Sequence, residues 1–362
     1  MARPTRATIH PARIRHNGER VRALAPRARI MACVKADGYG HGSITSARAL
    51  HGVADGFAVA CIEEACALRD GGCEEPILLL EGPLEQCELT EAVAQHLSIC
   101  ISHEQQLQWL EQVALAAPLD CWLKIDTGMH RLGIPPADTA MAYRRLRNSP
   151  NARENITLLS HFARAEEPPE RGSLAQLQCF DEATEGLSGP RSCANSAAIL
   201  GLPQSHMDWV RPGYMLYGGS PFCDPGATAC GLQAAMELTS SVISLRDVAV
   251  GETVGYGGRW RATRPSRIAT IAIGYGDGYP RHAPDGTPVL VAGQRAPLAG
   301  KVSMDLLTVD VTDLQALTAG APVLLWGEAL PVDEIAQQAG TIGYELLAGM
   351  PARVPRVLAE PH

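Results

Sequence analysis

Residues 30–42 read IMACVKADGYGHG, an apolar run that ends at a lysine and continues through three glycines. Five consecutive apolar residues, 30–34, are typical of a strand that is buried on both faces, as in a parallel sheet. Lys35 stands where this strand ends. A lysine at a strand end is often only a solvated cap, yet it is rarely buried without a purpose. The segment therefore predicts a parallel sheet and makes Lys35 a candidate functional residue.

Similar apolar runs recur through the first two-thirds of the chain and alternate with amphipathic helical stretches. The further runs lie at residues 57–61, 77–80, 97–101, 119–125, 156–159, 192–194 and 207–210. The helical stretches lie at residues 43–50, 62–70, 103–113, 138–147, 173–187 and 196–202. Eight buried strands that alternate with helices predict an α/β fold, a (β/α)8 TIM barrel. The run at 192–194 is the weakest, so strand counting alone leaves a doubly wound sheet open.

The pattern changes after about residue 225, where helical periodicity gives way to β-rich segments separated by glycine and proline. These segments lie at residues 236–245, 267–273, 288–291, 306–311 and 322–325. One late helix is expected at 332–339, with Gly340 as its stop. We therefore expect two domains, a barrel over residues 11–230 and a mostly antiparallel β domain over residues 231–362.

Composition excludes several classes of protein. A net charge of −8 argues against a nucleic-acid partner, which would require a basic surface. No apolar stretch of about twenty residues and no secretory signal pattern occur, so we expect no membrane span and a cytoplasmic location. The arginines that crowd the first thirty residues are expected on a solvated N-terminal helix.

The cysteines give no sign of a metal site. Eleven are present without a Cys-x-x-Cys pair, which argues against structural zinc and against a disulfide framework, so no metal is expected. Cys33, Cys61, Cys100, Cys121 and Cys193 are expected to be small buried hydrophobic residues.

Four of the apolar runs end at basic residues or a histidine. Lys35 follows the first run, Lys124 lies in the run that leads to Arg131, and His161 and Arg211 follow later runs. In a barrel the carboxyl ends of the strands meet at one rim, where chemistry takes place. Taken alone, each of these residues is about as consistent with a solvated strand end as with a functional site. Together they predict a positive pocket for an anionic ligand, such as a phosphate-bearing cofactor with a carboxylate substrate.

Two loops strengthen the expectation of an anion site. Asn195 and Ser196 precede a helical stretch, and we expect Ser196 to be its N-cap, with free backbone N–H groups facing a phosphate. Gly213 follows Arg211 and Pro212, where a phosphate could approach the backbone closely. Neither loop is specific alone, because such pairs are usually caps and turns.

A set of motifs spans nearly the whole chain. They are KADGYGHG at 35–42, KIDTGMHRLG at 124–133, HFA at 161–163, ANSA at 194–197, VRPG at 210–213, GYG at 255–257, GYGDGY at 274–279, GKVSMD at 300–305, and Tyr344 ahead of RVPR at 353–356. In this order and spacing they resemble the alanine racemases. The resemblance implies a (β/α)8 barrel plus a C-terminal β domain, with a first strand at residues 1–10 that joins the β domain.

The resemblance also implies a cofactor and two bases. The cofactor is pyridoxal 5'-phosphate, held by Lys35, which also serves one face of alanine as a base, and Tyr256 serves the other face. A phenol with an ordinary pKa near 10 is a poor base, so His161 and Arg211 are expected to stabilise its anion. Arg211 is expected on the cofactor's ring nitrogen, where it favours racemisation over transamination because it does not give up its proton.

Further residues follow from the same resemblance. Arg131 is expected to bind the substrate carboxylate, and Lys124 to be carbamylated, which would remove its repulsion of Arg131. Ser192 departs from the family pattern, in which histidine is common, at a position expected near the phosphate. The residues expected to bind the cofactor, mainly through its phosphate, are Tyr39, Asn195, Ser196, Gly213, Tyr214 and Tyr344.

Part of the site is expected to come from a second copy of the chain. By resemblance, Tyr256 enters from the partner subunit, as do Tyr275 and Met304, which also touch the substrate and narrow the entrance. The resemblance thus implies a homodimer with shared active sites. D-alanine would serve peptidoglycan synthesis, or the enzyme would act in alanine catabolism.

Other interpretations stay open. One is a racemase of the same fold that acts on serine or a broad set of amino acids. Another is a non-catalytic pyridoxal-phosphate carrier, which would have no use for Tyr256. A third is a cofactor-free aldolase that uses a lysine Schiff base on a barrel. Decarboxylases that share the barrel fit less well, because the blocks around Tyr256 and Met304 match racemases.

Overall fold

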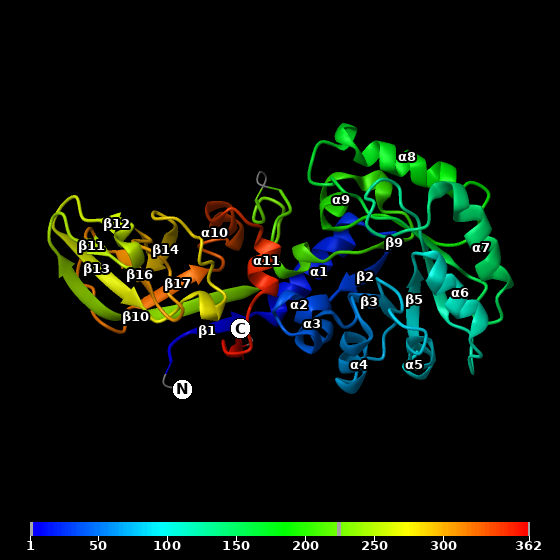
Figure 1. Cartoon of the computed structure of the whole chain (residues 1–362), viewed down its shortest axis with the longest axis horizontal. Coiled ribbons are helices and arrows are strands. Elements are labelled where there is room, and N and C mark those ends of the chain that lie inside the picture. Colours follow the sequence, from blue (N-terminus) through cyan, green and yellow to red (C-terminus); the bar gives the residue numbers. More distant parts are fainter. Residues whose placement is uncertain (1–2, 223–225, 361–362) are drawn as a thin grey trace.

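A parallel sheet of eight strands forms one body of the computed structural model, which describes residues 3–222 and 226–360 (Figure 1). The strands pair in the order β8-β7-β6-β5-β4-β3-β2-β9. They are β2 (Arg29–Cys33), β3 (Gly56–Val59), β4 (Ile77–Leu79), β5 (Leu97–Ile101), β6 (Asp120–Lys124), β7 (Thr157–Leu159), β8 (Arg191–Ser192) and β9 (Trp209–Val210). Between the two end strands, the N–H of Arg211 donates to the Ala194 carbonyl at 2.8 Å. The sheet is a nearly closed barrel, which confirms the predicted barrel and excludes the doubly wound sheet.

Alternating residues of the barrel strands face two different apolar environments. Met31 and Cys33 of β2 lie inside the barrel with Cys100 and Trp122, whereas Ile30 packs toward the helices. This period of two is what a strand buried on both faces requires.

The cysteine prediction is confirmed at four of its positions. The side chains of Cys33, Cys100, Cys121 and Cys193 are buried. It is wrong for Cys61, which is half-buried because it lies beyond the end of β3, at the start of the next helix.

Helices cover the outside of the barrel. They are α1 (Pro11–Leu24), α3 (Ser43–Leu50), α4 (Ile62–Asp70), α5 (Glu88–Ala94), α6 (Glu104–Gln112), α7 (Thr139–Asn148), α8 (Ser173–Ala183) and α9 (Ser196–Gly201). Helix α5 was not predicted, since its seven residues are too short to show a clear helical period. Short 3-10 turns lie at Pro136–Asp138, Pro169–Arg171, Pro203–Ser205, Tyr214–Tyr217, Tyr256–Gly258 and Tyr275–Asp277.

The N-terminal helix α1 is not simply solvated, which corrects the expectation for its arginines. Arg22 donates to the carbonyls of Ala28 and Val53 and forms a 2.6 Å ion pair with Asp55. Asp55 in turn accepts from the N–H of Ile30 at 2.8 Å. These contacts attach the helix to the first barrel strand.

The other body is a mostly antiparallel β domain, as predicted. Its strands are β1 (Arg6–Ile9), β10 (Met236–Val248), β11 (Thr253–Val254), β12 (Trp260–Arg261), β13 (Ser266–Ile271), β14 (Pro288–Val291), β15 (Gln294–Pro297), β16 (Leu307–Asp310), β17 (Pro322–Trp326) and β18 (Arg356–Leu358). Strand β10 pairs with β1 and β17 along its first half and with β13 along its second half, where the register shifts between Val242 and Ser244. Strand β1 also pairs in parallel with β18, so the N-terminal strand belongs to this domain, as the resemblance implies.

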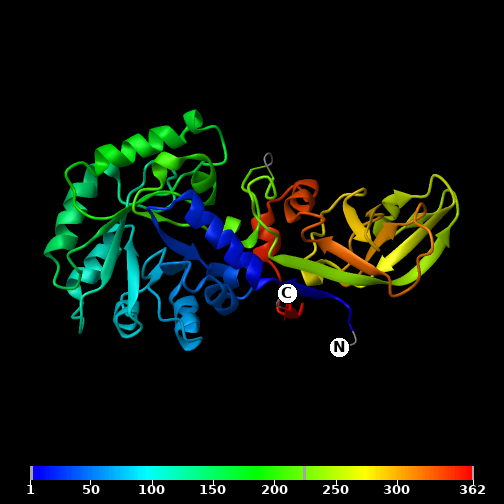
Figure 2. The same ribbon diagram turned by 180° about the vertical axis from the view of Figure 1, so that it is seen from behind.

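Two short helices connect the bodies. Helices α10 (Val332–Ala339) and α11 (Gly343–Ala348) lie between the β domain and the barrel, and Gly340 ends α10 with a φ of 70° (Figure 1). From behind, α1 runs beside the same junction while β10 extends away from it along the β domain (Figure 2). The β domain therefore meets the barrel through a narrow junction.

Membrane-spanning helices and clusters of metal ligands are both absent from the residues that the structure describes. None of their helices is long and apolar enough to cross a membrane. No group of three or more histidine, cysteine, aspartate or glutamate side chains within 3–222 and 226–360 could hold a metal ion.

The buried amide of Asn17 joins α1 to the segments that follow the barrel. Its nitrogen donates to the carbonyls of Leu216 at 3.0 Å and Gln233 at 2.8 Å, and its oxygen accepts from the N–H of Gln233 at 2.8 Å. We expect Asn17→Ala to lower the free energy of unfolding by about 2 kcal/mol, because three backbone groups lose their partner and one of them, the Leu216 carbonyl, is buried. Chemical denaturation measures this, with the exposed Asn148→Ala as control. Equal stability of the two variants would contradict the assignment.

Candidate active site

The chain turns sharply after β2, and this turn presents Lys35. Residues Lys35–Tyr39 form a turn that is left-handed after its first residue. Its non-glycine residues with a φ near +50° are Ala36, Asp37 and Tyr39. Such backbone costs roughly 1–2 kcal/mol per residue, so surrounding contacts must hold it. The carboxylate of Glu64 does so, accepting from the N–H of Ala36 at 2.7 Å and of Ala60 at 2.8 Å.

A cavity of about 710 Å³ opens at the carboxyl ends of the barrel strands. It is lined by all the barrel residues that the sequence analysis assigned to the site and by Tyr344 of α11. These residues are Lys35, Tyr39, Lys124, Arg131, His161, Asn195, Ser196, Arg211, Gly213, Tyr214 and Tyr344. Four basic side chains converge there, so the cavity favours an anionic ligand.

Arg211 is 4% exposed and is held by the strands on its side of the barrel. One of its Nη atoms donates to the Ser192 Oγ at 2.6 Å, and the other donates to the Ser160 carbonyl at 2.6 Å. Ser192, the position that departs from the family pattern, therefore supports Arg211. Burial lowers the pKa of Arg211, but a guanidinium still keeps its charge.

His161 lies beside Arg211 and is neutral. Its Nδ1 is 3.2 Å from the Nη2 of Arg211, which can only donate, so Nδ1 accepts and Nε2 carries the proton. Burial, then the charges of Arg211 and Lys124, hold the pKa of His161 well below its ordinary value. The ring therefore presents one N–H donor on the side away from Arg211.

Lys124 and Arg131 come from β6 and the loop that follows it. Lys124 is 9% exposed, and its burial together with the charges of Arg211 and Arg131 lowers the pKa of its amine. The loop to Arg131 is shaped by Asp126, whose Oδ1 accepts from the N–H groups of Gly128 and His130, each at 3.0 Å. This turn sets the path of the backbone between Lys124 and Arg131.

The loops expected to bind a phosphate differ in detail from the prediction. Asn195, not Ser196, caps α9, since its side chain accepts from the N–H of Ala198 at 3.1 Å. The hydroxyl of Ser196 accepts from the N–H of Gly213 at 3.0 Å, which joins the two loops. At Gly213 a Cβ atom would stand 2.5 Å from the hydroxyl oxygen of Tyr39, so only glycine lets that hydroxyl approach the loop.

Tyr214 is a packing residue whose hydroxyl is already used. The hydroxyl donates to Asp333 of α10 at 2.6 Å. The ring stacks on Tyr344, with centroids 3.8 Å apart and planes at 14°. The hydroxyl of Tyr214 is therefore not free for a phosphate, and the ring fixes Tyr344 at the cavity.

Three expected site residues do not lie at this cavity. Tyr256, Tyr275 and Met304 belong to loops of the β domain and are 69%, 38% and 54% exposed. The Tyr275 and Met304 loops adjoin one another, because the N–H of Tyr275 donates to the Ser303 carbonyl at 3.0 Å. The Tyr256 loop lies next to the Met304 loop, since a Cβ atom at Gly255 would stand 3.5 Å from the backbone nitrogen of Lys301. A cluster of exposed apolar and aromatic side chains in one β domain is typical of a surface that contacts another molecule.

One charged residue at the cavity was missed. Glu81, two positions beyond the end of β4, lines the cavity with Leu80, and its charge raises the pKa of Lys124. The rule that identified Lys35, a charged residue directly after an apolar run, would have found it.

Comparisons with known proteins agree over nearly the whole chain. Two family models match, described as alanine racemase, N-terminal domain, over residues 9–221, and alanine racemase, C-terminal domain, over residues 235–358. A curated relative named "Alanine racemase, biosynthetic" from Pseudomonas aeruginosa is 50% identical over 354 residues, covering 98% of this chain and 99% of the relative. One named "Alanine racemase" from Halorhodospira halophila is 48% identical over 356 residues, or 98% of each chain.

Solved structures are also similar. The crystal structure of biosynthetic alanine racemase from Pseudomonas aeruginosa matches with a TM-score of 0.97 and 49% identity, covering 99% of this chain and 100% of that one. Alanine racemase from Acinetobacter baumannii matches with a TM-score of 0.93 and 36% identity over the same shares of each chain.

His41 follows the Lys35 turn but is buried beneath it. Its Nδ1 donates to the Tyr39 carbonyl at 2.8 Å, and burial lowers its pKa to about 4. In the unfolded chain the His41 ring takes up a proton near pH 6.5. Above that pH the ring is neutral in both states, so its burial does not reduce the free energy of unfolding. We expect about 3 kcal/mol to be lost progressively as the pH falls from about 6.5 to about 4, with no further loss from this group below that. Ring ¹⁵N shifts, assigned with His41→Gln, should show no titration step near pH 6.5; such a step would contradict the burial argument.

Proposed function

This chain belongs to the alanine racemase family, and on that premise we propose that Lys35 and Tyr256 are the two bases that serve opposite faces of the substrate. The activity is that of an isomerase, the interconversion of L-alanine and D-alanine. The observation that carries the two-base proposal is the division of the site. Lys35 lies in the cationic cavity of the barrel, whereas Tyr256 is exposed on the β domain.

The cavity fits pyridoxal 5'-phosphate as the cofactor. Its volume of about 710 Å³ is within the usual range for ligand pockets, and it combines the amine of Lys35 with an anion-binding region. The close approach of the Tyr39 hydroxyl to Gly213 leaves a hydroxyl donor beside the linked Ser196 and Gly213 loops. When bound, the cofactor supplies an electron sink for the α-carbon of the amino acid.

Individual residues would then hold particular parts of the cofactor. Lys35 would hold the aldehyde carbon and Arg211 the ring nitrogen. Tyr39, Ser196, Gly213, Tyr344 and the backbone N–H of Tyr214 would hold the phosphate, with Asn195 fixing the start of α9. Because Arg211 does not give up its proton, it would leave the ring nitrogen of the bound cofactor unprotonated, which would favour return of the proton to the α-carbon.

Tyr256 needs a partner to act as a base near neutral pH. His161 offers its Nε2–H, because its Nδ1 accepts from Arg211. A hydrogen bond from Nε2 to the Tyr256 oxygen, in a cavity with several cations, would stabilise the phenolate and lower its pKa. Arg211 and His161 thus form a chain of donors that ends at Tyr256.

We propose that the protein is a homodimer in which each site is shared. One copy supplies the barrel cavity with Lys35, and the other supplies Tyr256, Tyr275 and Met304. The exposure of these three side chains supports this, and Arg131 would hold the carboxylate of alanine. In this division, residues 11–230 hold the cofactor, and residues 231–362 with the N-terminal strand at 1–10 supply the second base.

Lys124 is proposed to be carbamylated. Its lowered pKa raises the fraction of neutral amine, which can add CO₂ and release a proton. The carbamate would be negative, so two repelling cations would become an ion pair between Lys124 and Arg131. That pair would orient Arg131 toward the substrate.

We propose further that the D-alanine serves peptidoglycan synthesis or that the reaction acts in catabolism. The serine racemase and the non-catalytic carrier are not favoured, since Tyr344 narrows the cavity and Tyr256 has no role in a carrier.

Deuterium incorporation tests the two bases. In D₂O we expect the α-position of both isomers to take up deuterium, and Tyr256→Phe to lower kcat by about 10²–10⁴ while the visible absorbance of the bound cofactor remains. Tyr143→Phe, on the outer helix α7, is the control and should turn over normally. Undiminished exchange in the Tyr256 variant would show that another group is the second base.

Intact mass tests the modification of Lys124. We expect the native chain to be heavier than its sequence by one CO₂, and the increase to disappear in Lys124→Met or after acid denaturation. In the Lys124 variant the KM for alanine should rise by a larger factor than that by which the cofactor content falls. The reason is that Arg131, which would bind the substrate, loses its negative partner. An unmodified mass under native conditions would contradict the proposal.

A further inference from the structure

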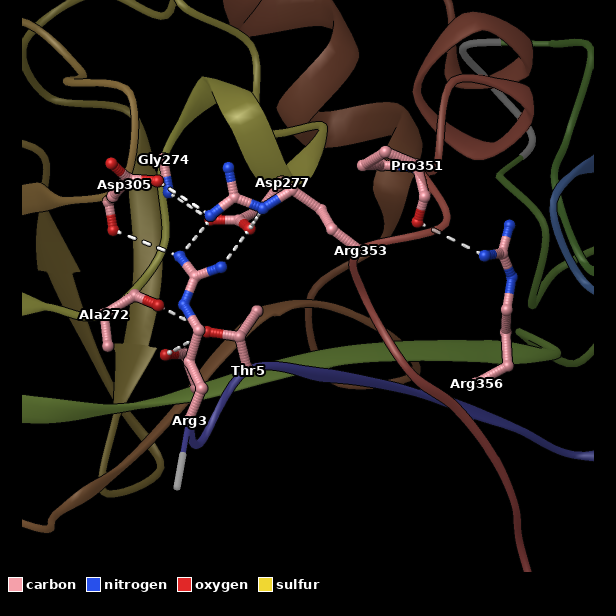
Figure 3. A network of polar contacts seen from close by, with 10 residues as sticks. Arg3, Thr5, Ala272, Gly274, Asp277, Asp305, Pro351, Arg353 and Arg356 are labelled. Carbon is pink, nitrogen blue, oxygen red and sulfur yellow. Dashed lines mark hydrogen bonds and ion pairs between the residues drawn. The ribbon is translucent and has the colours of Figure 1, made fainter. Parts of the chain in front are cut away.

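A buried carboxylate holds the Tyr275 loop through two arginines that come from opposite ends of the chain (Figure 3). Asp277 is 0% exposed. Arg3 donates from its two Nη atoms to the two carboxylate oxygens, each at 2.6 Å. The Nε of Arg353 lies 3.1 Å from Asp277 Oδ1. The carboxylate is therefore paired on two sides, as a buried charge requires.

The same network reaches the loop that carries Met304. Arg353 donates to the carboxylate of Asp305 at 2.7 Å, and Arg3 donates to the carbonyl of Asp305 at 3.4 Å. Positive and negative groups thus alternate through Arg3, Asp277, Arg353 and Asp305. This arrangement links the two loops by charge as well as by backbone.

Backbone contacts bring the two loops together. The N–H of Gly276 donates to the Met304 carbonyl at 2.8 Å, and the N–H of Gly274 donates to Asp277 at 2.9 Å. At Gly274 a Cβ atom would lie 2.4 Å from the Met304 carbonyl oxygen. The loops that carry Tyr275 and Met304 are therefore joined, and the Asp277 carboxylate accepts a backbone bond within the first of them.

The arginines are themselves fixed by neighbouring strands. Arg3 precedes β1 and Arg353 precedes β18, and these two strands pair in parallel. The hydroxyl of Thr5 also bonds to the carbonyl of Ala272, near the start of the Tyr275 loop (Figure 3). The N-terminal and C-terminal segments of the chain thus both bind the Tyr275 loop, and they do so on the same side of it.

We propose that Asp277 is a positioning residue that acts in trans. With Arg3 and Arg353, it sets the orientation of the Tyr275 and Met304 side chains that one copy supplies to the active site of the other. Neither Asp277 nor the two arginines line the cavity of their own barrel. The inference rests on the proposed shared site.

The first measurement is the activity of the variant homodimer. Asp277→Asn keeps the size of the side chain and removes its charge, so Arg3 and Arg353 lose their buried partner. We expect kcat/KM for alanine to fall about tenfold, because small displacements of groups that contact a substrate are costly. Asp313→Asn breaks the exposed pair with Arg264 in the same domain and is the matched control. Wild-type kcat/KM in the Asp277 variant would overturn the proposal.

Mixed dimers then separate positioning from general destabilisation. Two differently tagged copies are co-expressed and purified through both tags. A Lys35→Ala chain with an Asp277→Asn chain has one site with both an intact lysine and intact loops, and should retain about half of the wild-type activity. A Lys35→Ala/Asp277→Asn chain with a wild-type chain has intact lysine only where the loops are altered, and should be about tenfold slower. Equal activity of the two hybrids would overturn the role in trans.

Two further variants keep the test decisive. The hybrid of Lys35→Ala with Tyr256→Phe tests the shared site itself, and its failure to regain activity would refute the proposed function independently of Asp277. If Asp277→Asn does not fold, Arg3→Gln takes its place in both hybrids, since Arg353 still pairs with the carboxylate. It should show the same difference between hybrids with a smaller loss, and no difference would overturn the inference.

Discussion

The buried guanidinium of Arg211 is the interaction on which most of the active site depends. It contacts the Ser192 hydroxyl and the Ser160 carbonyl, so it ties the loop after β9 to β8 and to the end of β7. Strands β8 and β9 are the two ends of the sheet, and few backbone hydrogen bonds join them where the barrel closes. The same group fixes the tautomer of His161. One side chain thus joins the strands where the barrel closes and orients the His161 ring that is proposed to donate to Tyr256.

The division of the molecule into two bodies has a chemical consequence. The barrel holds a cationic cavity, and the β domain closes one side of it with Tyr344, stacked on Tyr214. The same β domain directs Tyr256 away from that cavity and leaves it exposed. The proposed two-base reaction needs groups on opposite faces of one carbon, so in that proposal a second copy would complete each site. In the proposed dimer, the buried charges around Asp277 would hold in place the Tyr275 and Met304 loops that one copy supplies to the other.

Prediction succeeded where a residue type has few alternatives. The alternation of buried runs and helices identified the barrel, and a basic residue after a buried run identified Lys35 and Arg211. Prediction failed where several residues could play the same local role. Ser196 and Asn195 are both good caps, and only the hydrogen bond to Ala198 shows that Asn195 is used. Likewise the support of Arg211 by Ser192 depends on strands far apart in sequence.

The sequence by itself determined the two-domain architecture, the family and the set of residues that lie at the barrel mouth, because burial periodicity and motif order are local properties of the chain. The tertiary structure decided the rest. It set the left-handed turn that presents Lys35, the neutral tautomer of His161, and the use of the Tyr214 hydroxyl by Asp333. It also placed Arg3 and Arg353 on one carboxylate. These depend on burial and on distances between remote segments, which residue spacing does not contain.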